Sequence, residues 1–316
     1  MQIIASPQEF QKLCWAWRTQ GLRTALVPTM GFLHAGHVSL IQWARANAER
    51  VMVSLFVNPT QFGPNEDLDR YPRDPEGDAA KALAAGADAL FIPAPGSMYP
   101  QGFATTVSVT GLTQGLCGRS RPGHFNGVAT VVSKLLLLSL PSVAVFGQKD
   151  WQQLAVIRRL AADLDFPVEI MGCPIVREPD GLALSSRNVS LNPAERAQAP
   201  AIHQGLLLAR EWAVEAAPAS PESASTAPSA AKGEAGHSAR PAATLAAKSA
   251  ASPVAALIAR LKAHYERAMP EGVIDYIECV HPETMEPLEQ LVGPALMAVA
   301  VKFSRARLID NMLLAQ

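Results

Sequence analysis

The chain is poor in three features that would assign it to a class at once: long apolar runs, paired cysteines, and an excess of charge of one sign. Its longest apolar block, residues 135–146, is interrupted by Ser139, Pro141 and Ser142. A membrane-spanning helix needs about 20 apolar residues, so this block does not predict one. The opening residues MQIIASP contain neither a basic stretch nor a long apolar stretch, and we therefore expect no secretion signal.

The spacing of the cysteines and the net charge narrow the possible classes of protein further. The four cysteines are scattered singly and form no C-x-x-C pair, which favours reduced thiols in a cytoplasmic protein over a disulfide framework. With 27 basic and 28 acidic residues the formal net charge is −1, so we expect no nucleic-acid or membrane partner. The fingerprints G-x-x-x-x-G-K-[ST] and G-x-G-x-x-G are also missing. Any anion site must therefore come from local clusters of basic residues.

What the sequence does contain is an alternation of short apolar runs and helical patterns. Strands are predicted at 24–27, 51–56, 89–92, 143–146 and 168–172, and helices at 8–20, 38–49, 75–85, 127–139 and 151–163. This alternation predicts an α/β fold with a parallel sheet covered by helices on both faces. In such folds ligands bind at the carboxyl ends of the strands. The loops that follow the strands are therefore the first places to look for a site.

Residues 216–252 have a different composition. They are mostly Ala, Ser and Pro with scattered charges, and they lack aromatic and almost all large aliphatic side chains. Such a segment buries too little surface to offset its ordering entropy, so we predict a flexible insertion. The alternative is that its alanine-rich end, residues 242–256, extends the following helix.

The clearest cluster follows the first predicted strand, in TMGFLHAGH at residues 29–37. If a helix begins near Leu33, His34 and His37 lie at i and i+3 on one face of its first turn. Unpaired backbone N–H groups and the helix dipole favour anions there, and imidazoles add donors. Two alternatives remain open. A metal pair lacks the i, i+4 spacing and the glutamate of the helical zinc motif, and the rings can also be ordinary polar residues at a helix start.

Polar groups follow other predicted strands as well, in four segments at residues 56–74, 118–136, 145–160 and 176–191. In the first, Asn58 and Gln61 come directly after a strand, where amides orient a small polar substrate. An ordinary polar loop fits the same residues. In the second, Arg119, Arg121 and His124 either bind anions or tie their loop to a neighbouring subunit.

The last two segments favour a phosphate. Lys149 lies on a turn after a strand, and Asp150 is either functional or simply an N-cap. A Pro-Asp-Gly turn presents Ser185, Ser186 and Arg187, whose hydroxyls, guanidinium and backbone N–H groups can close over a polyphosphate. Each cluster is weak evidence alone. Together they place the basic groups beside the strand ends of one sheet.

With these residues side by side, the chain resembles the pantoate–β-alanine ligase family of the HIGH-motif nucleotidyltransferase superfamily. The resemblance covers nearly all of the chain except the insertion. It rests on motifs that occur in the family's order: PTMGFLHAGH, FVNPTQFG, DLDRYPRD, SRPGHFNGV, FGQKDWQQL, DGLALSSRN, IDYIECVHPETMEPL and RLIDN. An H-x-G-H alone points only to the superfamily, whereas the full series is specific to this family.

The resemblance implies a two-step reaction. ATP activates the carboxylate of (R)-pantoate as pantoyl adenylate with release of pyrophosphate, and the β-alanine amine then displaces AMP to give pantothenate. Because two anions meet in the first step, fixed positive groups and Mg²⁺ are needed. The catalytic residues that the resemblance implies are His34, His37, Lys149, Ser185 and Arg187.

The resemblance also implies binding roles. ATP contacts are expected from Met30, His37, Gly147, Lys149, Asp150, Val176, Ser185, Ser186 and Arg187. Gln61 and Gln153 are expected to bind pantoate. Asp78 is expected to be the magnesium-associated carboxylate. We expect a Rossmann-like domain over residues 1–176 and a smaller C-terminal α/β lid domain over residues 177–316, in a homodimer.

Two rival functions stay open. The first is another adenylyl-transferring enzyme of the superfamily, against which Gln61 and Gln153 argue because this pair suits a small hydroxy acid. The second is a nucleotide-binding regulator without catalysis. The intact basic residues His34, His37, Lys149 and Arg187 argue against it.

Overall fold

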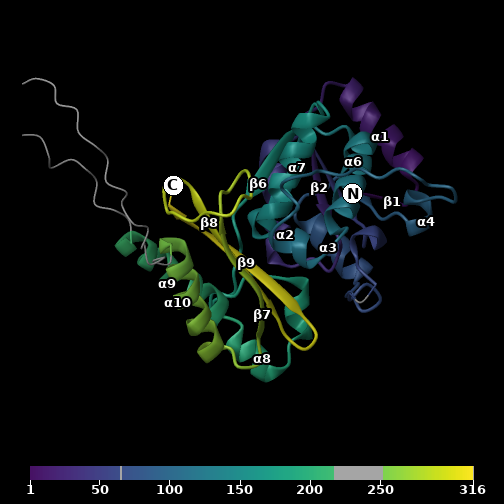
Figure 1. Ribbon diagram of the computed structural model, residues 1–316. Coiled ribbons are helices and arrows are strands. Elements are labelled where there is room, and N and C mark those ends of the chain that lie inside the picture. The colour runs from purple at the N-terminus through teal and green to yellow at the C-terminus, as the bar shows by residue number, and fades with distance from the viewer. Residues whose placement is uncertain (65, 217–251, 316) are drawn as a thin grey trace, which may run out of the picture.

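The computed structural model describes residues 1–64, 66–216 and 252–315 (Figure 1). The predicted flexible insertion at 216–252 therefore lies outside the described residues, apart from its two ends. Ala216 is the last residue of helix α9 (Ala201–Ala216). Ser252 is the N-cap of helix α10 (Pro253–Ala268), where its hydroxyl accepts a hydrogen bond from the Ala255 N–H at 3.1 Å.

A parallel sheet of six strands forms the larger half of the described chain (Figure 1). Its strands are β1 (Gln2–Ile4), β2 (Thr24–Thr29), β3 (Arg50–Leu55), β4 (Ala89–Phe91), β5 (Val143–Gly147) and β6 (Glu169–Cys173). They are ordered β1-β4-β3-β2-β5-β6. The chain runs from β2 outward to β3 and β4 and then returns to β5 on the other side of β2. The crevice at the carboxyl ends of β2 and β5 is thus the switch point where α/β folds bind ligands.

Helices cover both faces of this sheet. The first face carries α1 (Pro7–Thr19), α6 (His124–Ser139) and α7 (Trp151–Asp163), and the second carries α2 (Ala35–Asn47) and α3 (Pro75–Ala84). Successive strand residues point to opposite faces. In β2, Leu26 accordingly packs with the first group of helices, while Ala25 and Val27 pack with the second.

The predicted elements of this region are confirmed, with small shifts at their ends. The five predicted strands agree with β2 to β6 to within two residues, and helices α2 and α6 begin three residues earlier than predicted. The short elements β1, α4 (Pro95–Met98) and α5 (Leu116–Ser120) were not predicted, and neither were the 3₁₀ turns η1 (Pro59–Gln61) and η2 (Gln148–Asp150). Each is too short to show a period in the sequence.

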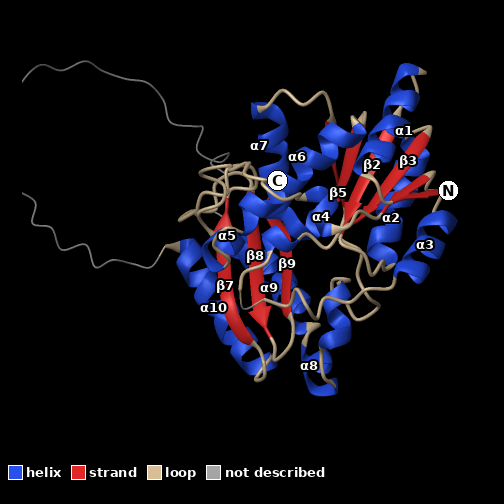
Figure 2. Cartoon of the chain, turned by 90° about the vertical axis from the view of Figure 1, so that its right-hand side faces the viewer, coloured by secondary structure: helices blue, strands red, loops and turns tan. Residues whose placement is uncertain are grey.

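The C-terminal residues form a second, smaller α/β unit. Helices α8 (Pro193–Gln198), α9 and α10 precede an antiparallel sheet of β7 (Val273–Val280), β8 (Ala295–Lys302) and β9 (Arg307–Ala315) (Figure 2). In β8, Met297 and Val299 pack against α9 and α10, while Leu296 and Ala298 join the apolar cluster of the six-stranded sheet. The central strand β8 is therefore buried on both faces. The predicted α/β fold class with a Rossmann-like sheet is confirmed.

None of the helices in the described ranges combines the length and the apolar character that crossing a membrane requires.

Candidate active site

Two adjoining cavities lie at the carboxyl ends of the parallel strands. The first has a volume of about 190 Å³ and is lined by Met30, His34, His37, Gln61, Gly147 and Val176, among others. The second has a volume of about 430 Å³, and its lining includes Arg121, His124, Ser185, Arg187 and Asn311. Lys149, Asp150 and Gln153 line both. Of the predicted site residues, only Asp78 and Ser186 line neither cavity.

The two histidines form a capping box at the start of α2. The helix begins at Ala35, two residues after the start near Leu33 that was supposed for the histidine pair, and His34 is its N-cap. The Gly36 N–H donates to Nδ1 of His34 at 3.1 Å, and the His34 N–H donates to Nδ1 of His37 at 3.3 Å. The ring centroids are 4.0 Å apart. A Cβ at Gly36 would lie 2.9 Å from the His34 ring, so this close packing requires glycine there.

These contacts fix the protonation of both rings. Because each Nδ1 accepts a hydrogen bond, the proton of each neutral ring is on Nε2. Burial, and then the charge of Lys149, lower the pKa of His34 to about 4. Burial and the neighbouring His34 lower the pKa of His37 to about 3. Both rings are therefore neutral near pH 7, and each has an Nε2–H group available to donate to an anion in the first cavity.

Asp78 holds the loop that precedes the histidines. Its carboxylate accepts hydrogen bonds from the N–H groups of Phe32 at 2.7 Å and Leu33 at 2.6 Å, and the residue is only 2% exposed. Phe32 has φ of +51°, a left-handed conformation that is uncommon for a bulky residue. Ser186 also stabilises this loop, since its hydroxyl donates a hydrogen bond to the Phe32 carbonyl at 3.3 Å. The two carboxylate contacts explain how the chain keeps Phe32 in this conformation.

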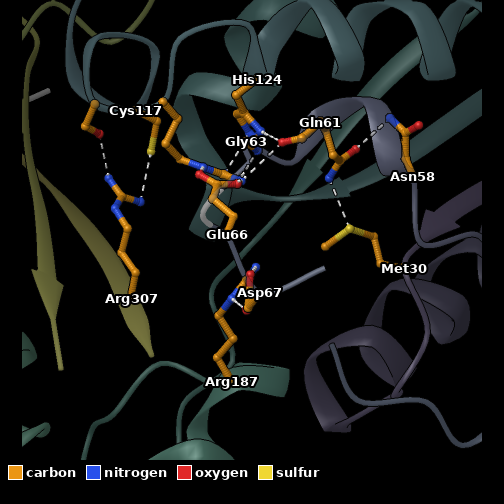
Figure 3. Close-up of polar contacts among 12 residues, drawn as sticks. Met30, Asn58, Gln61, Gly63, Glu66, Asp67, Cys117, His124, Arg187 and Arg307 are labelled. Carbon is orange, nitrogen blue, oxygen red and sulfur yellow. Dashed lines mark hydrogen bonds and ion pairs between the residues drawn. The ribbon is translucent and has the colours of Figure 1, made fainter. Parts of the chain in front are cut away.

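Gln61 belongs to a polar network that faces the first cavity (Figure 3). Its side-chain oxygen accepts from the Asn58 amide at 3.1 Å, and its amide nitrogen donates to the Met30 sulfur at 3.0 Å. Gln61 is 8% exposed, so these contacts fix its orientation. Of the two consecutive glutamines on α7, Gln153 lines both cavities. Gln152 is instead buried, and it donates to the Leu112 and Gly115 carbonyls.

Two arginines of the second cavity are paired with the consecutive carboxylates Glu66 and Asp67, which are labelled in Figure 3. Arg187 donates from Nε and Nη2 to Asp67 at 2.8 and 2.9 Å, and Nε of Arg121 donates to Glu66 at 2.6 Å. Burial alone raises the pKa of Asp67, but the hydrogen bond and charge of Arg187 outweigh it and hold that pKa below its usual value. Neither carboxylate was predicted as a site residue. Glu66 lies in the polar loop after β3, and Asp67 appeared only as the first residue of the DLDRYPRD motif.

His124 is held between Gln61 and Arg121. Its Nδ1 lies 2.8 Å from the Gln61 carbonyl and its Nε2 lies 3.1 Å from Nη1 of Arg121. Burial, followed by the charge of Arg121, lowers the pKa of His124 to about 4. Arg119 points elsewhere and pairs with Glu278 of β7 at 2.6 Å. This pair ties α5 to the C-terminal sheet within one chain.

Lys149 lies on the 3₁₀ turn η2 (Gln148–Asp150) between β5 and α7. Its Nζ is 4.0 Å from the Asp150 carboxylate. Asp150 occupies the N-cap position of α7, but in the described structure its side chain makes no capping hydrogen bond. Because it lines both cavities instead, the geometry favours a functional role over the simple N-cap.

Comparison with known proteins identifies the family. The family model described as pantoate-beta-alanine ligase matches residues 2–313. The chain belongs to the pantoate–β-alanine ligase family. It is 54% identical to the pantothenate synthetase of Oleidesulfovibrio alaskensis over 314 residues, which cover 99% of this chain and 100% of that protein. It is 52% identical to the pantothenate synthetase of Solidesulfovibrio magneticus, with 100% and 99% covered.

Solved structures of family members are similar throughout the chain. Pantothenate synthetase from Thermus thermophilus matches with a TM-score of 0.82 and 43% identity, covering 100% of both chains. Pantoate-beta-alanine ligase from Francisella tularensis, solved in complex with beta-gamma ATP and beta-alanine, matches with a TM-score of 0.72 and 29% identity. That match covers 99% of this chain and 98% of the other. The recognition of the family from its motifs is thus confirmed over nearly the whole chain.

Proposed function

We propose that the two cavities divide the ligase reaction between them. Pantoyl adenylate forms in the first cavity, and the β-alanine that attacks it binds in the second. The overall activity is that of the family: the enzyme forms pantothenate from ATP, pantoate and β-alanine. One observation supports the division above all others. Lys149, Asp150 and Gln153 line both cavities, so a group bound in either one reaches the same reacting centre.

In the first step a pantoate carboxylate oxygen attacks the α-phosphorus of ATP, and the bond to pyrophosphate breaks. The Nε2–H groups of His34 and His37 and the ammonium of Lys149 stabilise the charge that develops on the phosphates. The N-terminus of α2 adds its dipole at the same place. Because both rings are neutral, they bind the triphosphate as hydrogen-bond donors. Lys149 then supplies the main positive charge from this side.

Further roles follow from the lining of the cavities. Gln61 and Gln153 hold the hydroxyls and carboxylate of pantoate, for which the fixed amide of Gln61 is already oriented. For ATP, we propose backbone contacts from Met30 and Val176 and ribose contacts from Gly147 and Asp150. All four of these line the first cavity.

The segment Ser185–Arg187 completes the phosphate site. Ser185 lines the second cavity, and Ser186 joins the segment to the loop of the histidines through the Phe32 carbonyl. Arg187 reaches the pyrophosphate by exchanging Asp67 for phosphate oxygens, since both present the paired acceptors that a guanidinium prefers.

Mg²⁺ is proposed to enter with ATP. Proteins hold this ion through one or two carboxylates together with substrate phosphates rather than in all-protein cages. The described residues contain no group of three or more His, Cys, Asp or Glu that would hold a metal ion alone. Asp78 is the carboxylate that the family resemblance associates with the ion, but its oxygens accept the Phe32 and Leu33 N–H groups and it lines neither cavity. It would therefore act from behind the loop that precedes the histidines, on an ion that is bound mainly by the nucleotide. When bound, the ion would neutralise charge on the phosphates.

In the second step the β-alanine amine attacks the acyl carbon of pantoyl adenylate, the bond to AMP breaks, and the amine loses a proton. The second cavity suits this substrate because Arg121 and Lys149 line it together with the carboxylates Glu66 and Asp150. These groups offer partners for both ends of a zwitterion. Residues of β8 and β9 complete the wall and keep water from the mixed anhydride.

We further propose that residues 1–176 and 177–316 act as two domains that close over the substrates, in a homodimer located in the cytoplasm. Three separate apolar clusters support the division, because one of them belongs to the C-terminal unit alone. The four cysteines are all buried and unpaired, which agrees with a reducing compartment. Light scattering in solution would test the dimer, and a mass of one chain would refute it.

The test of the proposed function is a mass-spectrometric assay with pantoate, β-alanine, Mg²⁺ and ATP, in which each acid is omitted in turn. The proposal requires pantothenate together with equal AMP and pyrophosphate, and pyrophosphate formation that needs pantoate. Bound ATP that is never cleaved would favour a regulator. AMP without pantothenate would favour another adenylyl-transferring enzyme.

A further inference from the structure

One side chain of the C-terminal sheet fastens the turn that carries Lys149. The Asn311 amide nitrogen donates to the carbonyl of Gln148 at 3.0 Å and to the carbonyl of Lys149 at 2.9 Å. A primary amide has two N–H donors, so these contacts use both. Asn311 lies on β9 and is 6% exposed. Water therefore has little access to replace these bonds if they are lost.

Asn311 is itself held in place by a buried ion pair. Its backbone N–H donates to the Asp310 carboxylate at 2.8 Å, and Asp310 is 4% exposed. Nη1 and Nη2 of Arg177 donate hydrogen bonds to the two oxygens of the same carboxylate, at 2.6 and 3.0 Å. Arg177 lies on the stretch that leads from β6 to the Ser185–Arg187 segment. A continuous set of contacts thus connects that stretch, β9 and the Lys149 turn.

We propose that Asn311 is a positioning residue for Lys149 in the adenylation step. This inference rests on the proposed function. A lysine side chain has four rotatable bonds, so the point from which it starts decides where its ammonium can reach. Misplacing a catalytic group by about 1 Å can cost on the order of a hundredfold in rate. Asn311 fixes that starting point by binding the carbonyls on both sides of the Lys149 nitrogen and α-carbon.

The test is a double-mutant cycle on pantoate-dependent ATP–pyrophosphate exchange, with Asn311→Ala, Lys149→Ala and the double variant. Asn311→Ala should lower kcat by roughly tenfold to a hundredfold and change the KM for pantoate by less than about threefold. In the Lys149→Ala background the same substitution should cause almost no further loss, because a positioning residue acts only through its partner. Equal losses in the two backgrounds, or a normal rate for Asn311→Ala, would overturn the inference.

Two further variants separate a loss of positioning from a loss of stability. Met312→Ala truncates the next residue of β9, which packs on the apolar cluster of the C-terminal unit, and it should lower stability without lowering exchange. If Asn311→Ala does not fold, Asn311→Asp repeats the cycle with a side chain of the same size that offers only acceptors to the two carbonyls. A wild-type enzyme without pantoate-dependent exchange would overturn the proposed function itself, and the inference with it. Additive losses in an active enzyme would overturn the inference alone.

Discussion

The histidine pair makes the stability of the enzyme depend on pH in a way that can be calculated. In the folded chain the pKa of His34 is lowered to about 4 and that of His37 to about 3, whereas both have the ordinary value of 6.5 when exposed. Below pH 6.5 the unfolded chain therefore binds protons that the folded chain excludes. The sign follows from this difference: stability is complete above pH 6.5 and is lost as the pH falls toward the folded values.

The magnitude follows from the same values. Acidification from about pH 7.5 to about pH 5 removes roughly 2 kcal/mol for each ring, because the unfolded ring is then mostly protonated and the folded ring is still neutral. The two rings are in contact and only partly buried, so we expect roughly 2–4 kcal/mol for the pair.

The perturbation is the double substitution His34→Asn with His37→Gln. Asparagine is a good N-cap, and glutamine three residues later rebuilds the capping box without a titrating ring. Urea unfolding at both pH values, followed by tryptophan fluorescence, gives the stability lost on acidification. The variant should lose roughly 2–4 kcal/mol less than the wild type, while His281→Asn, outside both cavities, should behave as the wild type does. An equal loss in the wild type and the double variant would refute the neutral, buried state of the pair.

Three other predictions concern the reaction and the insertion. Lys149→Ala should reduce adenylation by about a hundredfold to a thousandfold while the protein stays folded, because a fixed donor at a developing anion contributes roughly 3–4 kcal/mol; near-normal exchange would remove Lys149 from the mechanism. Asp67→Asn should tighten ATP binding about fivefold in calorimetry, since the phosphates no longer compete with a carboxylate for Arg187; weaker binding would mean that Asp67 is needed to place the arginine. Deleting residues 218–250 and joining the ends through a short linker should keep kcat within a few fold, because α9 and α10 pack together on either side of the segment and loop length has a small energetic effect; a large loss would assign the segment a role.

The parallel sheet and most of the candidate site could be predicted because both depend on residues that are close together in the sequence. Each strand is a short apolar run, and the polar residues that matter follow it directly. The carboxyl ends of parallel strands meet at one edge, so His34, Gln61 and Lys149 come together without any knowledge of distant contacts.

The remaining features depend on partners that are remote in sequence. Nothing near Arg187 indicates that its guanidinium pairs with Asp67, which is 120 residues away. Asn311 appeared only as part of the RLIDN motif, and its contact with the Lys149 turn emerges from how the two sheets pack. The family resemblance likewise implied a carboxylate near the site at Asp78, but its hydrogen bonds to the loop of the histidines required coordinates.

The contact between Asn311 and the Lys149 carbonyl also has a consequence for how the enzyme is made. The two residues are 162 positions apart in the chain. A ribosome adding about 5–20 residues per second needs roughly 10–30 seconds to travel that distance. Once β6 (Glu169–Cys173) has been made, early in this interval, the nascent chain contains every strand of the parallel sheet and both histidines, but the turn of Lys149 has no side chain to fasten it. The proposed positioning of Lys149 therefore has to wait until Asn311 has been made, later than all six strands of the parallel sheet.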